Sequence, residues 1–337
     1  MPAPGDVLLH RYTIRAPLGR GGMGSVYRAF DERLTIEVAV KELTPPPGAR
    51  PEELAALRDQ FKQEATVLAR LKHPGLVSVT DFFEEGGSVY LVMNLVPGES
   101  LAERVERAGP LAESLAADLG VRLLDALDYC HQRGVLHRDI KPNNIILQPD
   151  GSALGAPVLV DFGLVKLWNP ANPTTRTLVR GMGSPNYASP EHYGFALSHT
   201  DARSDLYSVG ATLYYALTAN DPPAATDRLL RPEIMPPLRQ VAPWVSPNAA
   251  DAVSQALAMQ PEGRFTGARA MRAALLGAPV AAAGLSAIGT AATTAAVATS
   301  PITPVPARRG PPVWALAAGA LLVLMLVGGG AWLAGRL

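Results

Sequence analysis

Cysteine is almost absent from this sequence of 337 residues, which contains only Cys130. An intrachain disulfide is therefore excluded, and with it a small secreted domain held together by disulfides. We expect Cys130 to be a buried apolar side chain of a helix. The first ten residues also lack a basic start followed by an apolar run of about 7–15 residues, so we expect no secretory signal peptide and a cytosolic amino end.

Acidic residues are missing from the carboxyl end of the sequence. The last one is Glu262, and beyond Arg272 the only charges are three arginines. The overall balance of 30 basic against 30 acidic residues therefore hides two parts of the chain that differ in charge content. Residues 1–272 have the charge content of an ordinary soluble domain, whereas residues 273–337 do not. With no basic excess, nucleic acid is not expected as a partner.

The longest hydrophobic run, VWALAAGALLVLMLVGGGAWLA, covers residues 313–334. A helix of this length rises about 33 Å, which is enough to cross a hydrocarbon core of about 30 Å. Trp314 and Trp332 lie near its ends, where indoles favour the membrane interface. Two arginines precede the run and one follows it, which favours a cytoplasmic location for the preceding part. We predict a transmembrane helix; a buried helix of a soluble domain is the alternative.

The tract before this run, residues 277–312, is rich in alanine, threonine and proline. Alanine and threonine are too weakly apolar to insert well, and proline favours an extended backbone. We expect a juxtamembrane linker here, with a second, hairpin-forming membrane segment as the alternative. Residues 335–337 would then be a short tail on the outer side.

Hydrophobic periodicity divides the soluble part into two lobes. Residues 12–93 contain short runs typical of strands around one helical stretch at 51–71. Helical patterns dominate residues 97–276, at 111–133, 205–218 and 249–259. The sequence therefore predicts an α+β fold at residues 12–276, with a small β-rich lobe and a larger helical lobe after an N-terminal extension of residues 1–11.

A glycine-rich string, LGRGGMGSV, covers residues 18–26. Glycine lets the backbone approach a polyphosphate closely, and amide groups in such turns favour anions. A dinucleotide site would need a helix after the loop, whereas this string continues into SVYRAF, which is typical of a strand. We interpret it as a hairpin lid over a nucleotide; a plain flexible hairpin is the alternative.

Three further motifs carry chemistry. The strand VAVK ends at Lys41, which alone could be a surface lysine, but Glu64 on the next predicted helix could pair with it and hold its ammonium against phosphate oxygens. HRDIKPNN at residues 137–144 precedes DFG at 161–163. These strings supply a carboxylate to orient a hydroxyl, a cation for a transferring phosphate, and two oxygen ligands for Mg²⁺. They come, in that order, from Asp139, Lys141, Asn144 and Asp161.

In this order the motifs resemble those of protein kinases, and more closely those of bacterial, eukaryotic-type (Hanks-type), membrane-anchored Ser/Thr protein kinases. The resemblance covers about residues 11–275. It implies a two-lobed kinase fold that transfers the γ-phosphoryl group of Mg·ATP, or of ATP with Mn²⁺, to Ser or Thr hydroxyls of protein substrates. The residues that it assigns to ATP binding are Leu18, Gly19, Gly21, Gly22, Gly24, Val26, Ala39, Lys41, Glu64, Met93, Leu95 and Val96.

The resemblance also assigns the reacting groups. Asp139 would be the catalytic base, Lys141 would contact the γ-phosphate, and Asn144 and Asp161 would bind the metal. Asn94 stands in the hinge where related kinases often carry glutamate, but the hinge contacts adenine through its backbone.

Four residues would have structural roles by the same resemblance. Glu191, in SPE, would pair with Arg264, in PEGRF, and an exposed surface contact is the alternative for that pair. Asp205 resembles the aspartate that braces the catalytic loop. Arg138 precedes the base, a pattern that accompanies control by phosphorylation of the activation loop.

The predicted regulatory phosphosites are Thr174, Thr175 and Thr177, for which a solvated polar turn is the alternative. We expect autophosphorylation in trans, by an enzyme held as a single-pass protein on the cytoplasmic (plasma) membrane through lipid contact of its C-terminal helix. The kinase domain would face the cytoplasm.

Other functions compete with this interpretation. A pseudokinase scaffold would usually lack Lys41, Asp139 or Asp161, and all three are present. A small-molecule phosphotransferase would not be expected to have the long segment from Asp161 to Glu191. A receptor with an outer sensor domain is disfavoured because only about three residues follow the hydrophobic run.

Overall fold

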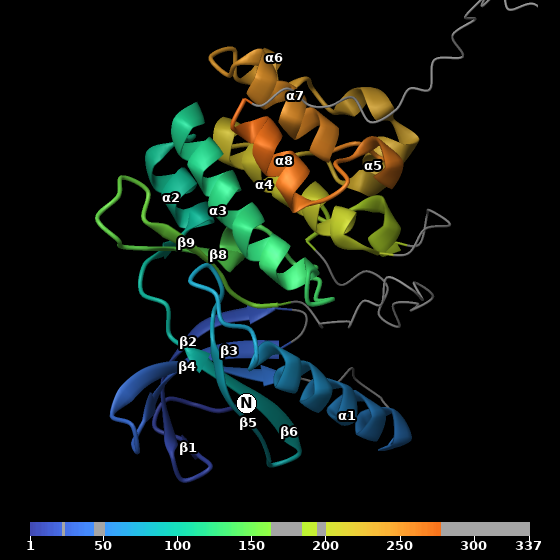
Figure 1. Cartoon of the computed structure of the whole chain (residues 1–337). Helices are drawn as coiled ribbons and strands as arrows, with labels where there is room; N and C mark the ends of the chain where they lie inside the picture. Colours follow the sequence, from blue (N-terminus) through green and yellow to red (C-terminus); the bar gives the residue numbers. More distant parts are fainter. Residues whose placement is uncertain (22–23, 44–50, 163–183, 194–199, 278–337) are drawn as a thin grey trace, which may run out of the picture. The chain divides into compact units, whose positions relative to one another are not determined.

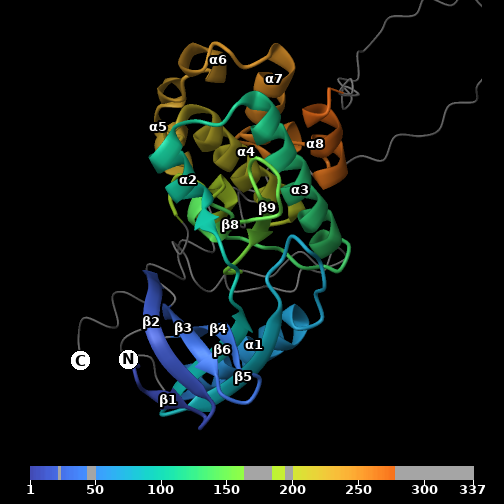
Figure 2. The same cartoon turned by 90° about the vertical axis from the view of Figure 1, so that its left-hand side faces the viewer.

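The computed structural model describes residues 1–21, 24–43, 51–162, 184–193 and 200–277, apart from the side chains of residues 51–57, 60 and 64 (Figures 1 and 2). The element order begins with strands and ends with helices, as the periodicity predicts. The predicted α+β class, with a β-rich first lobe and a helical second lobe, is therefore confirmed.

The first lobe is an antiparallel sheet with the strand order β1-β2-β3-β4-β6-β5. Its strands are β1 (Val7–Leu8), β2 (Tyr12–Gly21), β3 (Gly24–Asp31), β4 (Ile36–Leu43), β5 (Val79–Glu85) and β6 (Ser88–Asn94). The sheet starts earlier than predicted, because β1 lies within the N-terminal extension and pairs with β2. Helix α1 (Pro51–Leu68) connects β4 to β5 and ends three residues before the predicted bound of 71.

The two faces of this sheet have different partners, because side chains alternate along a strand. In β4, Val38 and Val40 belong to a cluster confined to the first lobe. Ala39, between them, belongs instead to the main core that extends into the helical lobe. The next residue on the Ala39 face is Lys41, which the alternation therefore directs toward the helical lobe.

The helical lobe is built on α3 (Glu113–His131) and α4 (Ala202–Thr218), with α7 (Pro247–Ala256) and α8 (Ala268–Leu275) packed against them (Figures 1 and 2). Helices α3, α4 and α7 match the three predicted helical stretches to within a few residues, whereas α8 matches none of them. Every residue from Ser204 to Thr218 is buried, so α4 is the centre of the lobe. Cys130 is fully buried in α3, as expected, and burial raises the pKa of its thiol to about 12.

Shorter elements complete the helical lobe. Helices α2 (Leu101–Ala108), α5 (Ala225–Leu230) and α6 (Leu238–Val241) lie at its edges, with 3₁₀ turns η1 (Pro142–Asn144), η2 (Pro190–Tyr193), η3 (Pro232–Ile234) and η4 (Pro261–Gly263). A small antiparallel sheet has the order β7-β8-β9, from β7 (Glu99–Ser100), β8 (Ile145–Gln148) and β9 (Ala156–Leu159).

Backbone pairing joins the two lobes on the carboxyl side of α1. The amide of Val77 donates to the carbonyl of Leu159 at 3.0 Å, and the amide of Leu159 donates to Gly75 at 2.9 Å. Leu159 ends β9, just before Asp161. The segment that follows α1 is therefore attached to the strand that leads into the predicted metal-binding aspartate.

Within the residues that the structure describes, no helix is both long and apolar enough to cross a membrane. The predicted span at 313–334, the tail at 335–337 and the linker beyond residue 277 lie outside those residues.

Two glycines in the helical lobe should respond differently to substitution by alanine. A Cβ atom on Gly210, in α4, would lie 2.7 Å from the Cβ of Ala256 in α7, whereas on Gly120, in α3, it would lie 2.8 Å from the flexible Cδ1 end of Leu275. Gly210→Ala should lower the free energy of unfolding by about 1–3 kcal/mol through overpacking. Gly120→Ala should change it by less than about 1 kcal/mol, because alanine favours the helix and Leu275 can move. Urea unfolding of both variants measures the difference, and equal losses would contradict this packing.

Candidate active site

Lys41 and Asp161 meet between the two lobes. The Nζ atom of Lys41 forms a salt bridge with Oδ1 of Asp161, 120 residues away in the chain. Lys41 is only 6% exposed, and the Asp161 carboxylate compensates the charge of its buried ammonium. Asp161 has a φ of 57°, a left-handed conformation that is uncommon outside glycine and often occurs at functional sites. Glu64, the predicted partner of Lys41, lies in α1, and its side chain is outside the described part of the structure.

Asp139, Lys141 and Asn144 gather within one short loop that ends in η1. Nζ of Lys141 donates to both carboxylate oxygens of Asp139, at 3.1 and 2.9 Å. Nδ2 of Asn144 donates to the carbonyl and to Oδ2 of Asp139, both at 2.8 Å. These contacts hold the Asp139 carboxylate in one orientation. The amide of Val160 donates to the carbonyl of Asn144 at 2.9 Å, which ties this loop to the segment that carries Asp161.

Asp205, in the first turn of α4, holds the backbone of the same loop. Its carboxylate accepts hydrogen bonds from the amides of His137, at 3.0 Å, and Arg138, at 2.8 Å. Nε2 of His131 contacts it at 2.8 Å. Complete burial opposes its ionisation, but the hydrogen bond and charge of His131 and the amide of Arg138 lower the pKa of Asp205 to about 2. Asp205 is thus a buried anion at neutral pH.

His137 packs beside the segment that carries Asp161. Its ring lies 4.4 Å from that of Phe162, centroid to centroid, and is fully buried. Burial lowers the pKa of His137, so its ring is neutral at pH 7. Among the described residues, neither ring nitrogen has a hydrogen-bond partner. His137 therefore acts as an apolar spacer rather than as a charged group.

Five of the residues assigned to ATP binding belong to the main core or pack against it. Ala39 and Met93 are buried members of the main core, and Val26, Leu95 and Val96 are partly buried against it.

The predicted phosphate loop is an open hairpin between β2 and β3. Leu18 is half exposed, and Gly19 and Gly21 pair with Val26 and Gly24 of β3. At Gly24 the φ is 135°, and a Cβ atom would lie 1.8 Å from the carbonyl oxygen of Glu42, so only glycine fits. Gly22 lies outside the described residues.

The donor set at Asn144 and Asp161 fits Mg²⁺. Because Nδ2 of Asn144 is bound to Asp139, the amide oxygen is the atom left for a cation, and Asp161 adds a carboxylate. Mg²⁺ is usually held by one or two protein carboxylates, with phosphates and water as the other ligands. In the described ranges no group of three or more His, Cys, Asp or Glu side chains could hold a metal without such help.

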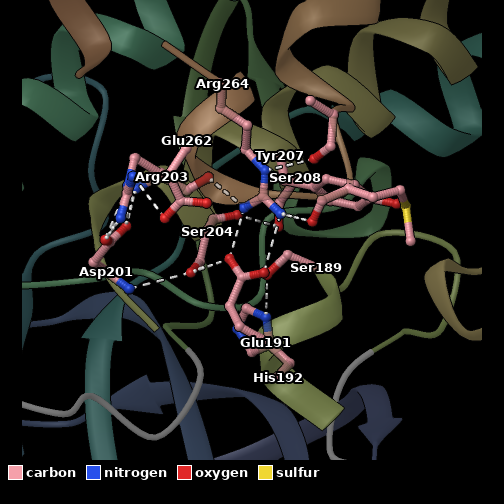
Figure 3. A network of polar contacts seen from close by, with 12 residues as sticks. Ser189, Glu191, His192, Asp201, Arg203, Ser204, Tyr207, Ser208, Glu262 and Arg264 are labelled. Atoms are coloured by element: carbon pink, nitrogen blue, oxygen red, sulfur yellow. Dashed lines mark hydrogen bonds and ion pairs between the residues drawn. The ribbon is translucent and has the colours of Figure 1, made fainter. Parts of the chain in front are cut away.

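A buried polar network fixes the segment that begins at residue 184 (Figure 3). The guanidinium of Arg264 binds the Glu191 carboxylate through two hydrogen bonds, at 2.6 and 3.0 Å. Both side chains are at most 1% exposed, which excludes the alternative of an exposed surface contact. Oγ of Ser204 donates to Glu191 at 2.7 Å. Burial by itself would raise the pKa of Glu191, but the hydrogen bonds and charge of Arg264 lower it below its usual value.

Several side-chain contacts in this region were not predicted from the sequence. Oγ of Ser189 contacts Nδ1 of His192 at 2.8 Å. NH2 of Arg138 donates to Oγ1 of Thr200 at 2.7 Å. His131 had no assigned role either. Single serine, threonine and histidine residues carry no periodicity or spacing, so only the fold reveals them.

The predicted phosphosites Thr174, Thr175 and Thr177 lie outside the described residues.

Comparisons with known proteins agree with this geometry. Residues 12–276 match the family model described as "Protein kinase domain". "Serine/threonine-protein kinase C" of Synechocystis sp. is 36% identical over 284 residues, which cover 82% of this chain and 51% of that protein. "Serine/threonine-protein kinase PknA" of Mycobacterium tuberculosis is 35% identical over 272 residues, which cover 78% of this chain and 60% of that protein. The chain thus spans between half and two thirds of the full length of these relatives.

A solved structure titled "PpkA-294 apo form" is also similar. It aligns with a TM-score of 0.65 at 29% identity, covering 82% of this chain and 99% of that one.

The buried ion pair should dominate the stability of the helical lobe. Arg264→Met leaves Glu191 as an uncompensated buried charge and should lower the free energy of unfolding by about 3–5 kcal/mol. Arg269→Met removes an ion pair to Asp128, but the Arg269 side chain is 77% exposed. This substitution should leave the free energy of unfolding nearly unchanged. Urea denaturation measures both, and similar values would mean that the burial of Arg264 has no energetic consequence.

Proposed function

Since the chain belongs to the protein kinase family and its relatives are serine/threonine protein kinases, we propose that it transfers the γ-phosphoryl group of Mg·ATP to Ser or Thr hydroxyls of proteins. The observation that carries the proposal is the loop in which Asp139, Lys141 and Asn144 are bound to one another. That loop is fastened to the segment of Asp161, whose carboxylate meets Lys41.

The residues divide the reaction between them. Asp139 orients the substrate hydroxyl and takes up its proton as the hydroxyl oxygen bonds to the γ-phosphorus. The bond from that phosphorus to the β,γ-bridging oxygen breaks, and ADP is the leaving group. Lys141, held beside Asp139, stabilises charge on the transferred group, and Lys41 contacts the α and β phosphates. Catalysis then consists mainly of positioning and charge stabilisation.

Asn144 and Asp161 would hold Mg²⁺, which neutralises phosphate charge when bound. Asp161 would then serve both the metal and Lys41. A pseudokinase scaffold remains the second candidate, but Lys41, Asp139 and Asp161 are all present and lie in contact with their neighbours in the site.

Asp139→Asn tests the proposal directly. The substitution keeps the shape of the side chain but removes the base, so phosphorylation of a generic basic protein should fall at least about 100-fold. Asp118→Asn, on the exposed face of α3, is the control and should retain wild-type turnover. Radiolabelled ATP measures both rates, with thermal unfolding to check the fold. An Asp139→Asn variant as active as the control would refute the assignment.

We also propose activation by autophosphorylation in trans on Thr174, Thr175 and Thr177. A phosphate near −2 charge could pair with Arg138, the cation beside the base, and order the loop. Incubation of the full chain with Mg·ATP should place phosphate on this cluster, as mass spectrometry would detect. Replacing all three threonines with alanine should lower turnover severalfold. Unchanged turnover would refute the regulatory role.

A membrane anchor at residues 313–334 is the third part of the proposal, supported by the length and composition of that run. The kinase domain would then lie on the cytoplasmic side and meet substrates near the membrane. The full chain should sediment with membranes and resist carbonate extraction, whereas a chain that ends at Gly277 should be released and remain active. Carbonate extraction of the full chain, or loss of activity on truncation, would contradict the anchor and linker.

A further inference from the structure

Arg138 has a strained backbone directly before the proposed base. Its φ is 67°, in the left-handed region that is unfavourable for a residue with a side chain. Such a conformation persists only where several independent contacts hold the backbone in place. The backbone torsions of Arg138 also set the direction in which the next residue, Asp139, leaves the loop. Whatever holds Arg138 therefore acts on the orientation of the base.

One set of contacts acts on the backbone, where Asp205 accepts the amides of His137 and Arg138. A separate contact acts on the side chain. NH2 of Arg138 donates to Oγ1 of Thr200 at 2.7 Å, and Thr200 is 6% exposed. A hydrogen bond from a charged donor in such a place is worth more than one between neutral groups in water.

The residues that follow Thr200 are held in place by hydrogen bonds. Thr200 directly precedes Asp201, the N-cap of α4, whose carboxylate accepts the Arg203 amide while the Ser204 hydroxyl accepts the Asp201 amide. Ser204 also donates to Glu191, the partner of Arg264 (Figure 3). The start of α4 is therefore fixed to the buried ion pair, and Thr200 directly precedes this fixed turn.

We propose that Thr200 is a positioning residue for the proposed phosphoryl transfer: its hydroxyl fixes the Arg138 side chain and, through the Arg138 backbone, the orientation of Asp139. The inference rests on the kinase activity proposed above, in which Asp139 is the base. Asp205 then binds the backbone amide of Arg138 and Thr200 binds its guanidinium group. Both residues lie at or just before the start of α4.

Thr200→Val removes the hydroxyl at nearly constant volume, and Thr200→Ser keeps it. The matched control is Thr212→Val. Thr212 is buried like Thr200, but it lies within α4 and its hydroxyl donates to the carbonyl of Ser208 in the same helix. In the full chain, Thr200→Val should lower kcat about tenfold with KM for ATP unchanged within about twofold, because the base and not the nucleotide site is misplaced. Thr200→Ser should restore kcat to within about twofold, and Thr212→Val should leave it unchanged.

A second measurement does not depend on activity. Hydrogen exchange of the amides of His137 and Arg138 should be about tenfold faster in Thr200→Val than in Thr212→Val, because the loop opens more often when the contact between Thr200 and Arg138 is lost. Equal exchange rates, or a kcat loss in Thr212→Val as large as that in Thr200→Val, would overturn the inference. A wild-type chain without kinase activity would refute the proposed function, and the exchange rates would still decide whether Thr200 holds the loop.

Discussion

The Asp205 carboxylate is the contact on which the arrangement of this site depends. It has no exposed surface, lies on a helix that is buried on every side from Ser204 to Thr218, and accepts the backbone amides of His137 and Arg138. A buried anion is costly unless its oxygens are bound, and here His131 and the two amides bind them. The free energy spent on burying Asp205 is therefore recovered only when the loop of His137, Arg138 and Asp139 adopts this conformation.

A second buried charge extends the same principle. Glu191 and Arg264 bind each other through two hydrogen bonds, and the remaining Arg264 donors reach the carbonyls of Ala258, Arg203 and Met259. Because Ser204 joins Glu191 to the start of α4, the segment around Glu191 and the loop before Asp139 are anchored on the same helical turn. The helical lobe thus supplies a rigid frame, to which the first lobe contributes Lys41 from one face of β4.

Much of the fold followed from the sequence because its signals are local. Alternation in VAVK separates Val38 and Val40 from Ala39 and Lys41, and the structure places them on opposite faces of the sheet. The helical periodicity predicted α1, α3, α4 and α7 to within a few residues. The edge strand β1 was not predicted, because a pair of residues in an extension has no period of its own.

The sequence by itself determined the inventory of the site: a glycine hairpin, a lysine on a strand, the loop of Asp139, Lys141 and Asn144, and the aspartate of DFG. Residue type and order carry this information because each group has a fixed chemistry. Only the tertiary structure decided which groups touch. Lys41 and Asp161 are 120 residues apart, Asp205 and His131 are 74 apart, and Arg138 and Thr200 are 62 apart. Such pairs form when the packing of whole helices and sheets brings distant segments together, and no local pattern encodes that packing.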